Sequence, residues 1–242
     1  MTNRPRAVVV PGAFSVPEHL ALFGNTLSAA GYPVTMVRLR GHAPGRSADL
    51  EGATLSHYLE DVLAEVDRAG PRPIIIGHSM GGLLAMKAAE QRRCSAALLF
   101  APAPPGPLMM TAKAVPVFLG MIHRVLAGSV LEPPLGPLER LALGPMLPEA
   151  RREALRLCVP ESGAAFRDMI FGKMRVNPDA ISCPVAILYG DQDVLVPPWQ
   201  IRRTVKRLKA TELRRPEMGH FLVGEPGWAE AERTVMDWLG RV

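Results

Sequence analysis

The stretch Ile74-Ile75-Ile76-Gly77-His78-Ser79-Met80-Gly81-Gly82 decides the fold of this 242-residue chain. It is a β-branched run that ends in Gly-x-Ser-x-Gly, and the apolar residues after it predict a helix. A serine at such a strand-to-helix turn has a strained backbone and an exposed hydroxyl, as a nucleophile needs. Side chains at positions 77 and 81 would collide with the neighbouring strand or helix. We therefore interpret Ser79 as a nucleophile, with the N–H groups of the following helix facing any developing negative charge.

The first hundred residues alternate between strand and helix signals. This order is typical of a parallel sheet with helices on both faces. The predicted strands are continuously apolar, as expected for strands that are buried on both sides. The predicted strands are Ala7–Val10, Val34–Arg38, Ile74–Ile76 and Ala96–Phe100, and the predicted helices are Glu18–Ala30, Leu55–Ala69 and Gly82–Arg92.

The alternation stops between Pro102 and about Asn177, where prolines are frequent and no segment predicts a strand. Apolar residues at helical spacing from Leu108 to Leu126 predict a helix with a kink at Pro116. We therefore expect one α/β core, residues 1–101 and 178–242, with a helical insertion at 102–177. The remaining predicted elements are helices at Arg151–Leu157, Ala164–Lys173, Trp199–Leu208 and Trp228–Leu239, and strands at Val185–Tyr189 and Glu212–Arg214.

The composition argues against several classes of protein. The chain is 48% hydrophobic and 21% charged, as a globular protein is, and its net charge of +5 comes from basic residues mixed with acidic ones. Only 5% of the residues are aromatic, so we expect no nucleic-acid surface. The three cysteines are scattered and form no Cys-x-x-Cys pair, which argues against a disulfide framework or a zinc site. We expect a cytoplasmic protein with no membrane contact, because the apolar run after Arg6 is too short for a signal peptide.

A serine hydroxyl needs a base that removes its proton and a third group that orients the base. His78 is too close to Ser79 along the turn, and His42 lies in an earlier loop. His220 is the candidate base, because it follows Gly219 in a loop between the last predicted strand and the last predicted helix. The three histidines on predicted helices are His19, His57 and His123.

The acid should follow another core strand and precede the histidine if the chain order is serine, acid, histidine. Val185–Tyr189 is that strand, and Gly190-Asp191-Gln192-Asp193 comes directly after it. We favour Asp193 over Asp191, since the longer reach past the turn brings its carboxylate toward the histidine loop. Asp191 would instead stabilise the turn itself.

Ester hydrolysis also needs N–H donors for the negative oxygen of its intermediate. The N–H of Met80, directly after the candidate nucleophile, is the first predicted donor. The second is expected in the loop after the first strand, Val10-Pro11-Gly12-Ala13-Phe14. Ala13 is the better candidate there and Phe14 the alternative.

Taken together, these motifs resemble an α/β-hydrolase fold protein of the lipase and esterase group that carries a helical cap. The resemblance implies that the three residues chosen above are nucleophile, acid and base, and that the chosen N–H groups form the oxyanion hole. It also implies that residues 102–177 cover the site as a cap. Many relatives have His-Gly where this chain has Pro11-Gly12, a departure that concerns the shape of the loop. The motifs that carry the resemblance are the loop at 8–14, Arg40-Gly41-His42, Gly77–Gly82, Gly190–Pro197 and Gly219-His220.

The leading hypothesis is hydrolysis of a carboxylic ester or thioester through an acyl-enzyme on Ser79, with no metal and no organic cofactor. A serine at this position argues against the related dehalogenases and epoxide hydrolases, which carry aspartate there. Apolar residues of the insertion would form an adaptable roof over a small to medium acyl or aromatic substrate, or would simply pack the insertion onto the core. The predicted substrate-binding residues are Phe14, Met109, Met110, Phe118, Met121 and Ile122.

Two alternatives stay open at this point. The same three residues could perform carbon–carbon bond hydrolysis, a lyase step or a cyclisation. The chain could also be a non-catalytic small-molecule binder on this fold. A monomer or a homodimer is expected, and the sequence leaves the physiological substrate open.

Overall fold

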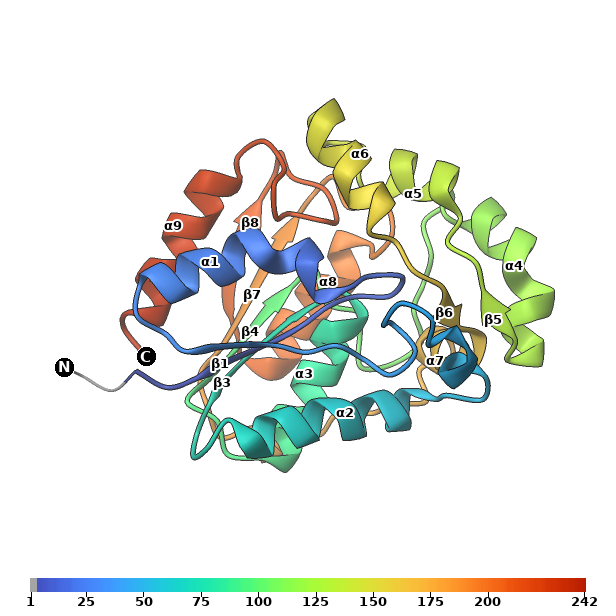
Figure 1. The fold of residues 1–242 in the computed structure, drawn as a ribbon. Helices are drawn as coiled ribbons and strands as arrows, with labels where there is room; N and C mark the ends of the chain where they lie inside the picture. Colours follow the sequence, from blue (N-terminus) through green and yellow to red (C-terminus); the bar gives the residue numbers. More distant parts are fainter. Residues whose placement is uncertain (1–3) are drawn as a thin grey trace.

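In a computed structural model, which describes residues 4–242, six parallel strands form the central sheet in the order β2-β1-β3-β4-β7-β8 (Figure 1). The four inner strands are buried along their whole length, which explains their continuously apolar sequences. The edge strand β8 is partly exposed and has a weaker sequence signal. The strands are β1 (Ala7–Val10), β2 (Val34–Met36), β3 (Ile74–His78), β4 (Ala96–Phe100), β7 (Val185–Gly190) and β8 (Thr211–Arg215).

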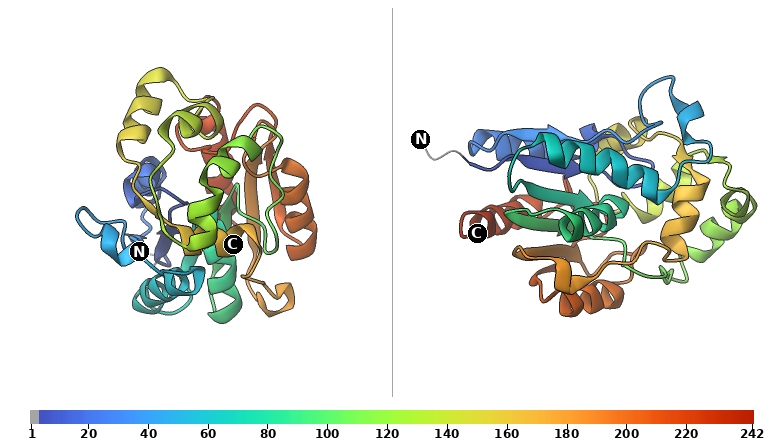
Figure 2. Two further views of the ribbon diagram at one scale, coloured as in Figure 1. Left: turned by 90° about the vertical axis from the view of Figure 1, so that its right-hand side faces the viewer. Right: turned by 90° about the horizontal axis from the view of Figure 1, so that it is seen from below.

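Helices cover both faces of the sheet (Figures 1 and 2). Helices α1 and α9 share one face, and α2, α3 and α8 lie on the other. The predicted core strands and helices are confirmed, with ends that shift by a few residues. The core helices are α1 (Ala21–Ala29), α2 (Leu55–Arg68), α3 (Met80–Gln91), α8 (Pro198–Leu208) and α9 (Trp228–Leu239), with short 3₁₀ turns at Pro17–Leu20, Ser47–Leu50 and Pro178–Ala180.

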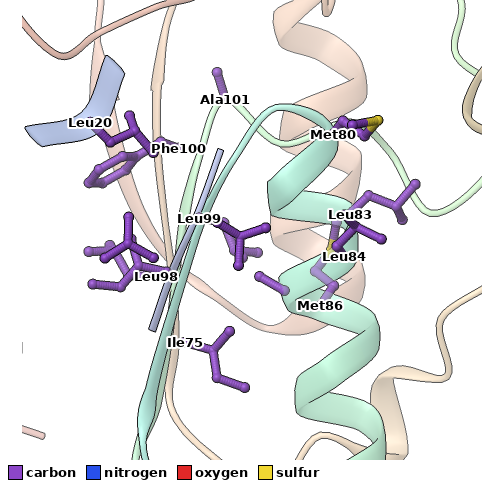
Figure 3. Packing of buried hydrophobic residues seen from close by; sticks show 14 of the residues in the cluster. Leu20, Ile75, Met80, Leu83, Leu84, Met86, Leu98, Leu99, Phe100 and Ala101 are labelled. Atoms are coloured by element: carbon purple, nitrogen blue, oxygen red, sulfur yellow. The ribbon is translucent and has the colours of Figure 1, made fainter. Parts of the chain in front are cut away.

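Strand β4 shows how both layers are filled. Successive side chains of a strand point to opposite faces, so Leu99 faces α3 while Leu98 and Phe100 face the other layer (Figure 3). The ring of Phe100 lies 5.2 Å from that of Phe23 in α1 and 5.9 Å from that of Trp228 in α9. This aromatic cluster joins the two helices to the middle of the sheet.

Between β4 and β7 the chain leaves the sheet and forms residues 102–177, named here the cap segment. It lies beyond the carboxyl ends of the strands, at the end of the molecule opposite both termini (Figures 1 and 2). Four helices and one antiparallel strand pair make up its regular structure. These elements are α4 (Val115–Ala127), β5 (Val130–Leu131), α5 (Leu135–Leu141), α6 (Pro148–Arg156), β6 (Glu161–Ser162) and α7 (Gly163–Ile170).

Two expectations for the cap segment are wrong. The segment does contain strands, because β5 pairs with β6, but two residues each are too few for an alternating pattern. The predicted kink at Pro116 is absent, because α4 begins only at Val115. Pro116 therefore occupies the first helical turn, where its missing N–H needs no partner.

Two of the cysteines, expected to be scattered, lie side by side. The sulfur atoms of Cys94 and Cys183 are 2.9 Å apart. Both residues precede adjacent strands, since Ala97 of β4 and Val185 of β7 are paired in register. None of the helices in residues 4–242 combines the length and apolarity needed to cross a membrane.

Candidate active site

Ser79 occupies the sharp turn between β3 and α3. Its backbone has φ +53° and ψ −118°, a region that residues with side chains rarely adopt. The turn is held from two sides, because the Ser79 N–H donates to the Phe100 carbonyl at 2.9 Å and the Ser79 carbonyl accepts from the N–H groups of Gly82 and Ala103, both at 2.9 Å. The neighbouring strand and the helix start together maintain the strained conformation.

The two glycines that flank Ser79 are required by close approach of other backbone. A Cβ atom at position 77 would lie 2.2 Å from the Gly81 carbonyl oxygen. A Cβ atom at position 81 would lie 2.3 Å from the Pro11 carbonyl oxygen. The collisions predicted from the sequence are therefore confirmed.

Ser79, His220 and Asp193 form one hydrogen-bonded chain. His220 Nε2 lies 3.0 Å from Ser79 Oγ, and His220 Nδ1 lies 2.7 Å from Asp193 Oδ2. Both His220 and Asp193 are buried. Burial alone would lower the pKa of His220, but the Asp193 carboxylate outweighs it, so this pKa is raised. The arrangement can pass a proton from the serine hydroxyl to the imidazole while the carboxylate stabilises the resulting charge.

The two aspartates that follow β7 have different partners. Asp193 Oδ1 accepts from the backbone N–H groups of Leu195 and Val196 at 2.8 and 2.9 Å, which leaves Oδ2 facing the histidine. Asp191 instead receives the side chain of Arg214, with both carboxylate oxygens 2.9 Å from Nε. Asp193 is thus the aspartate that faces His220, and Asp191 ties its turn to β8.

A buried glutamate that the sequence reasoning missed holds the His220 loop. Glu225 accepts from the backbone N–H groups of Gly219 at 2.6 Å, Phe221 at 3.0 Å and Leu222 at 2.9 Å. Only 3% of Glu225 is exposed. Because the carboxylate ties down the residues on both sides of His220, it fixes the approach of the imidazole to Ser79. Its place in the sequence, five residues after the candidate base, does not by itself distinguish it from a glutamate on the surface.

His78 does more than the local packing expected of it. Its Nε2–H donates to the His220 carbonyl at 3.0 Å, and its ring lies 5.1 Å from the His220 ring. Burial, together with the nearby His220, lowers the pKa of His78 to about 3. His78 is therefore neutral and acts as a second support for the histidine loop.

The candidate oxyanion donors differ in their availability. Within residues 4–242, the N–H groups of Met80 and Ala13 have no hydrogen-bond acceptor. The N–H of Phe14, the alternative candidate, is already engaged, because it donates to Glu161 Oε2 at 3.1 Å. The structure thus argues against Phe14 as a donor and leaves Ala13 beside Met80.

A cavity of about 140 Å³ opens over Ser79 and His220, between the core and the cap segment. Four of the six predicted substrate-binding residues line it: Phe14, Met110, Phe118 and Met121. Two do not. Met109 is 55% exposed and donates its N–H to Gln200 Oε1, and Ile122, one helical turn after Phe118, is half-buried but lies outside the lining. Further apolar lining residues are Leu108, Val117, Leu138, Leu141, Leu143, Phe166, Met169 and Leu195.

In the described part of the chain, no group of three or more His, Cys, Asp or Glu side chains is arranged to hold a metal ion. The polar side chains in the cavity lining are limited to serines, histidines and one cysteine. They are Ser15, His19, His78, Ser79, Cys158 and His220. The site therefore combines an apolar wall with one convergent polar corner at Ser79, as small-molecule sites commonly do.

The chain resembles known proteins both in sequence and in structure. The pyrethroid hydrolase of Sphingobium wenxiniae is 39% identical over 56 residues, which are 23% of this chain and only 20% of that enzyme. The structure is similar to the monoacylglycerol lipase of Paleococcus ferrophilus, with a TM-score of 0.78 and 22% identity over 98% of this chain and 94% of that one. It is also similar to a pyrethroid hydrolase of Sphingobium faniae, with a TM-score of 0.75 and 21% identity over 97% of each chain. Residues 7–232 match the sequence family described as the alpha/beta hydrolase family, and the chain therefore belongs to that family.

Proposed function

We propose that this protein is a serine hydrolase that cleaves carboxylic esters, or thioesters, of small to medium apolar substrates. The observation that carries the proposal is the hydrogen-bonded chain of Ser79, His220 and Asp193 at the floor of an apolar cavity. The esterase, lipase and pyrethroid hydrolase activities named for its structural neighbours agree with this reaction class.

In the proposed reaction, Ser79 Oγ attacks the carbonyl carbon of the ester while His220 Nε2 takes the hydroxyl proton. The carbonyl oxygen becomes negative and is bound by the N–H groups of Met80 and Ala13. His220 then gives its proton to the leaving alcohol, and the acyl group stays on Ser79. A water molecule, activated by the same histidine, attacks the acyl carbon and releases the carboxylic acid and free enzyme. Asp193 stabilises the imidazolium in both halves of the reaction.

We further propose that the cap segment, residues 102–177, selects the substrate. Phe118, Met121 and Met169 of the cap segment line the same cavity as Ser79. An apolar cavity of about 150 Å³ is large enough for a benzene ring, so a cavity of about 140 Å³ suits a short acyl chain or one aromatic ring. The flexible thioether side chains would let the roof adapt to substrates of different shape.

Labelling with a fluorophosphonate probe tests the proposed nucleophile. The wild-type protein should react, and the variants Ser79→Ala and His220→Ala should not. Asp191→Asn, which removes a carboxylate outside the hydrogen-bonded chain, serves as the control and should label normally. A folded wild-type protein that is not labelled would refute the serine hydrolase proposal and favour a non-catalytic binder.

A series of p-nitrophenyl esters from acetate to palmitate tests the substrate class. We expect kcat/KM to be greatest for short or medium chains and to fall at palmitate, because the cavity is small. Normal labelling of Ser79 with no hydrolysis anywhere in the series would contradict the ester assignment. That outcome would favour carbon–carbon bond cleavage, a lyase step or a cyclisation by the same residues.

A further inference from the structure

Glu161 of β6 is a fully buried carboxylate of the cap segment that reaches into the core. Its Oε1 accepts from Tyr58 Oη at 2.5 Å and from the Ser162 N–H at 2.7 Å, and it lies 3.4 Å from His42 Nε2. Its Oε2 accepts from the Phe14 N–H at 3.1 Å. The partners come from α2, from the loop after β2, from β6 itself and from the loop after β1. One side chain therefore joins the cap segment to three separate parts of the chain.

The contact with Phe14 is one of several that hold the loop beside Ser79. The N–H of Phe14 and the carbonyl of Ala13 belong to one peptide unit. This N–H donates a hydrogen bond to Glu161, and this carbonyl accepts one from the Ser15 hydroxyl at 3.2 Å. The Phe14 carbonyl accepts from the Val159 N–H at 3.1 Å. Phe14 has φ +57°, so its conformation needs such support. The cap segment thus binds Phe14 through both of its backbone polar groups.

The chemistry around Glu161 explains why a carboxylate is used. Every neighbour described above presents a hydrogen to it, and an ionised carboxylate only accepts. Burial alone would raise the pKa of Glu161, but His42 and the hydroxyl of Tyr58 favour the charged form, and its pKa is lowered. A carboxylate in this position remains ionised and keeps its bond to the Phe14 N–H.

We propose that Glu161 is a positioning residue for the oxyanion hole. By fixing the Ala13–Phe14 peptide, Glu161 holds the adjoining Ala13 N–H toward Ser79. This inference rests on the proposed hydrolase function. It gives the cap segment a part in the chemistry as well as in substrate selection, because a shift of β6 would move the oxyanion loop.

The variant Glu161→Gln tests this role with almost no change in shape. The amide oxygen can keep the bonds to Tyr58 and Ser162, but the amide NH₂ then faces the Phe14 N–H, where two donors repel each other. The matched control is Asp168→Asn in α7, a buried carboxylate of the same segment that pairs with Lys173 at 2.9 Å and does not line the cavity.

Two inhibitors separate the oxyanion hole from the rest of the cavity. A trifluoromethyl ketone forms a tetrahedral oxyanion adduct with the serine, whereas the matching methyl ketone reports binding of the apolar group. For Glu161→Gln we expect kcat and the affinity for the trifluoromethyl ketone to fall together by about ten- to a hundredfold. KM and the affinity for the methyl ketone should stay within about twofold of wild type. Asp168→Asn should resemble the wild type in all four measurements.

The outcomes distinguish this inference from the proposed function. A wild-type protein that binds the trifluoromethyl ketone no more tightly than the methyl ketone would refute the proposed hydrolysis itself. If the wild type discriminates and Glu161→Gln discriminates equally well, the positioning role is wrong. Should Glu161→Gln not fold, Tyr58→Phe removes one donor to the same carboxylate. A few-fold loss of trifluoromethyl ketone affinity in that variant would support the role, and unchanged affinity would contradict it.

Discussion

Replacing Glu225 by glutamine should loosen the loop that carries His220. In the native structure the carboxylate accepts three backbone N–H groups, two at Oε1 and one at Oε2. A glutamine oxygen can keep the bonds from Phe221 and Leu222, but its NH₂ group would then face the Gly219 N–H. One buried donor loses its partner, which costs about 1–3 kcal/mol of unfolding free energy. For a chain of this size, a loss of about 2 kcal/mol lowers Tm by about 4–8 °C.

The same substitution should change the pH dependence of activity. Burial lowers the pKa of His220, and the Asp193 carboxylate and, to a smaller extent, the Glu225 carboxylate raise it above its ordinary value. Removing that negative charge disfavours the imidazolium, so the pKa of His220 falls. Because the base must be neutral to accept the serine proton, kcat/KM rises with pH through this pKa. The acidic limb of the Glu225→Gln variant should therefore lie at lower pH than that of the wild type.

The change in Tm is measured by thermal unfolding followed by circular dichroism. The shift of the acidic limb is measured as kcat/KM for a p-nitrophenyl ester between about pH 5 and 9. Asp191→Asn is the control, because it removes a carboxylate that pairs with Arg214 and not with the His220 loop. Its acidic limb should coincide with that of the wild type. A Glu225→Gln variant with an unchanged Tm and an unchanged acidic limb would refute the assignment of Glu225 as the support of the loop.

Three further predictions concern other parts of the molecule. In a urea titration, Gly77→Ala should lower the free energy of unfolding by about 1–3 kcal/mol, because its Cβ would collide with backbone. Gly120→Ala should raise it by about 0.5–1 kcal/mol, because a Cβ there meets nothing within 4 Å, and equal effects of the two variants would contradict the steric argument. Asp193→Asn should lower kcat by about 10⁴-fold in the ester assay, because the histidine loses its oriented tautomer, and near-normal turnover would show that another group orients His220. Oxidised glutathione should form a disulfide between Cys94 and Cys183, and the two thiol hydrogens pass to the oxidised glutathione, which is reduced to two glutathione molecules. The number of titratable thiols should fall by two and recover with dithiothreitol, and an unchanged number would rule out the disulfide.

The residues that the sequence could predict are those whose position is signalled locally. Ser79 lies between two glycines at the end of an apolar strand, and His220 and Asp193 each follow a strand and a glycine. In a parallel sheet all carboxyl ends of strands lie at one edge, so loops at those ends can be expected to meet there. The structure places the three side chains within hydrogen-bond distance.

The supporting carboxylates could not be found in this way. Glu161 and Glu225 accept backbone N–H groups from distant or looped segments, and nothing in the neighbouring sequence separates them from glutamates on the surface. The burial of a charged group depends on partners that only the folded chain brings together.

The lining of the cavity was only partly predictable for a related reason. Apolar residues occupy more than half of the circumference of helix α4, from Val117 and Met121 through Phe118 and Ile122 to Leu119. Helical spacing identifies this broad apolar face but does not tell which part of it lines the cavity. In the structure Phe118 and Met121 line the cavity, while Leu119 is 59% exposed.

The bond between Glu161 and Phe14 has a consequence for protein engineering. Cap segments of related hydrolases invite exchange as modules, since both ends of this one leave the sheet at neighbouring strands, β4 and β7. A graft that lacks an acceptor at position 161 would leave the amide of Phe14 buried without its partner. Chimeras of this protein should therefore keep the stretch from Val159 to Ser162 with the recipient core and place their junctions outside it.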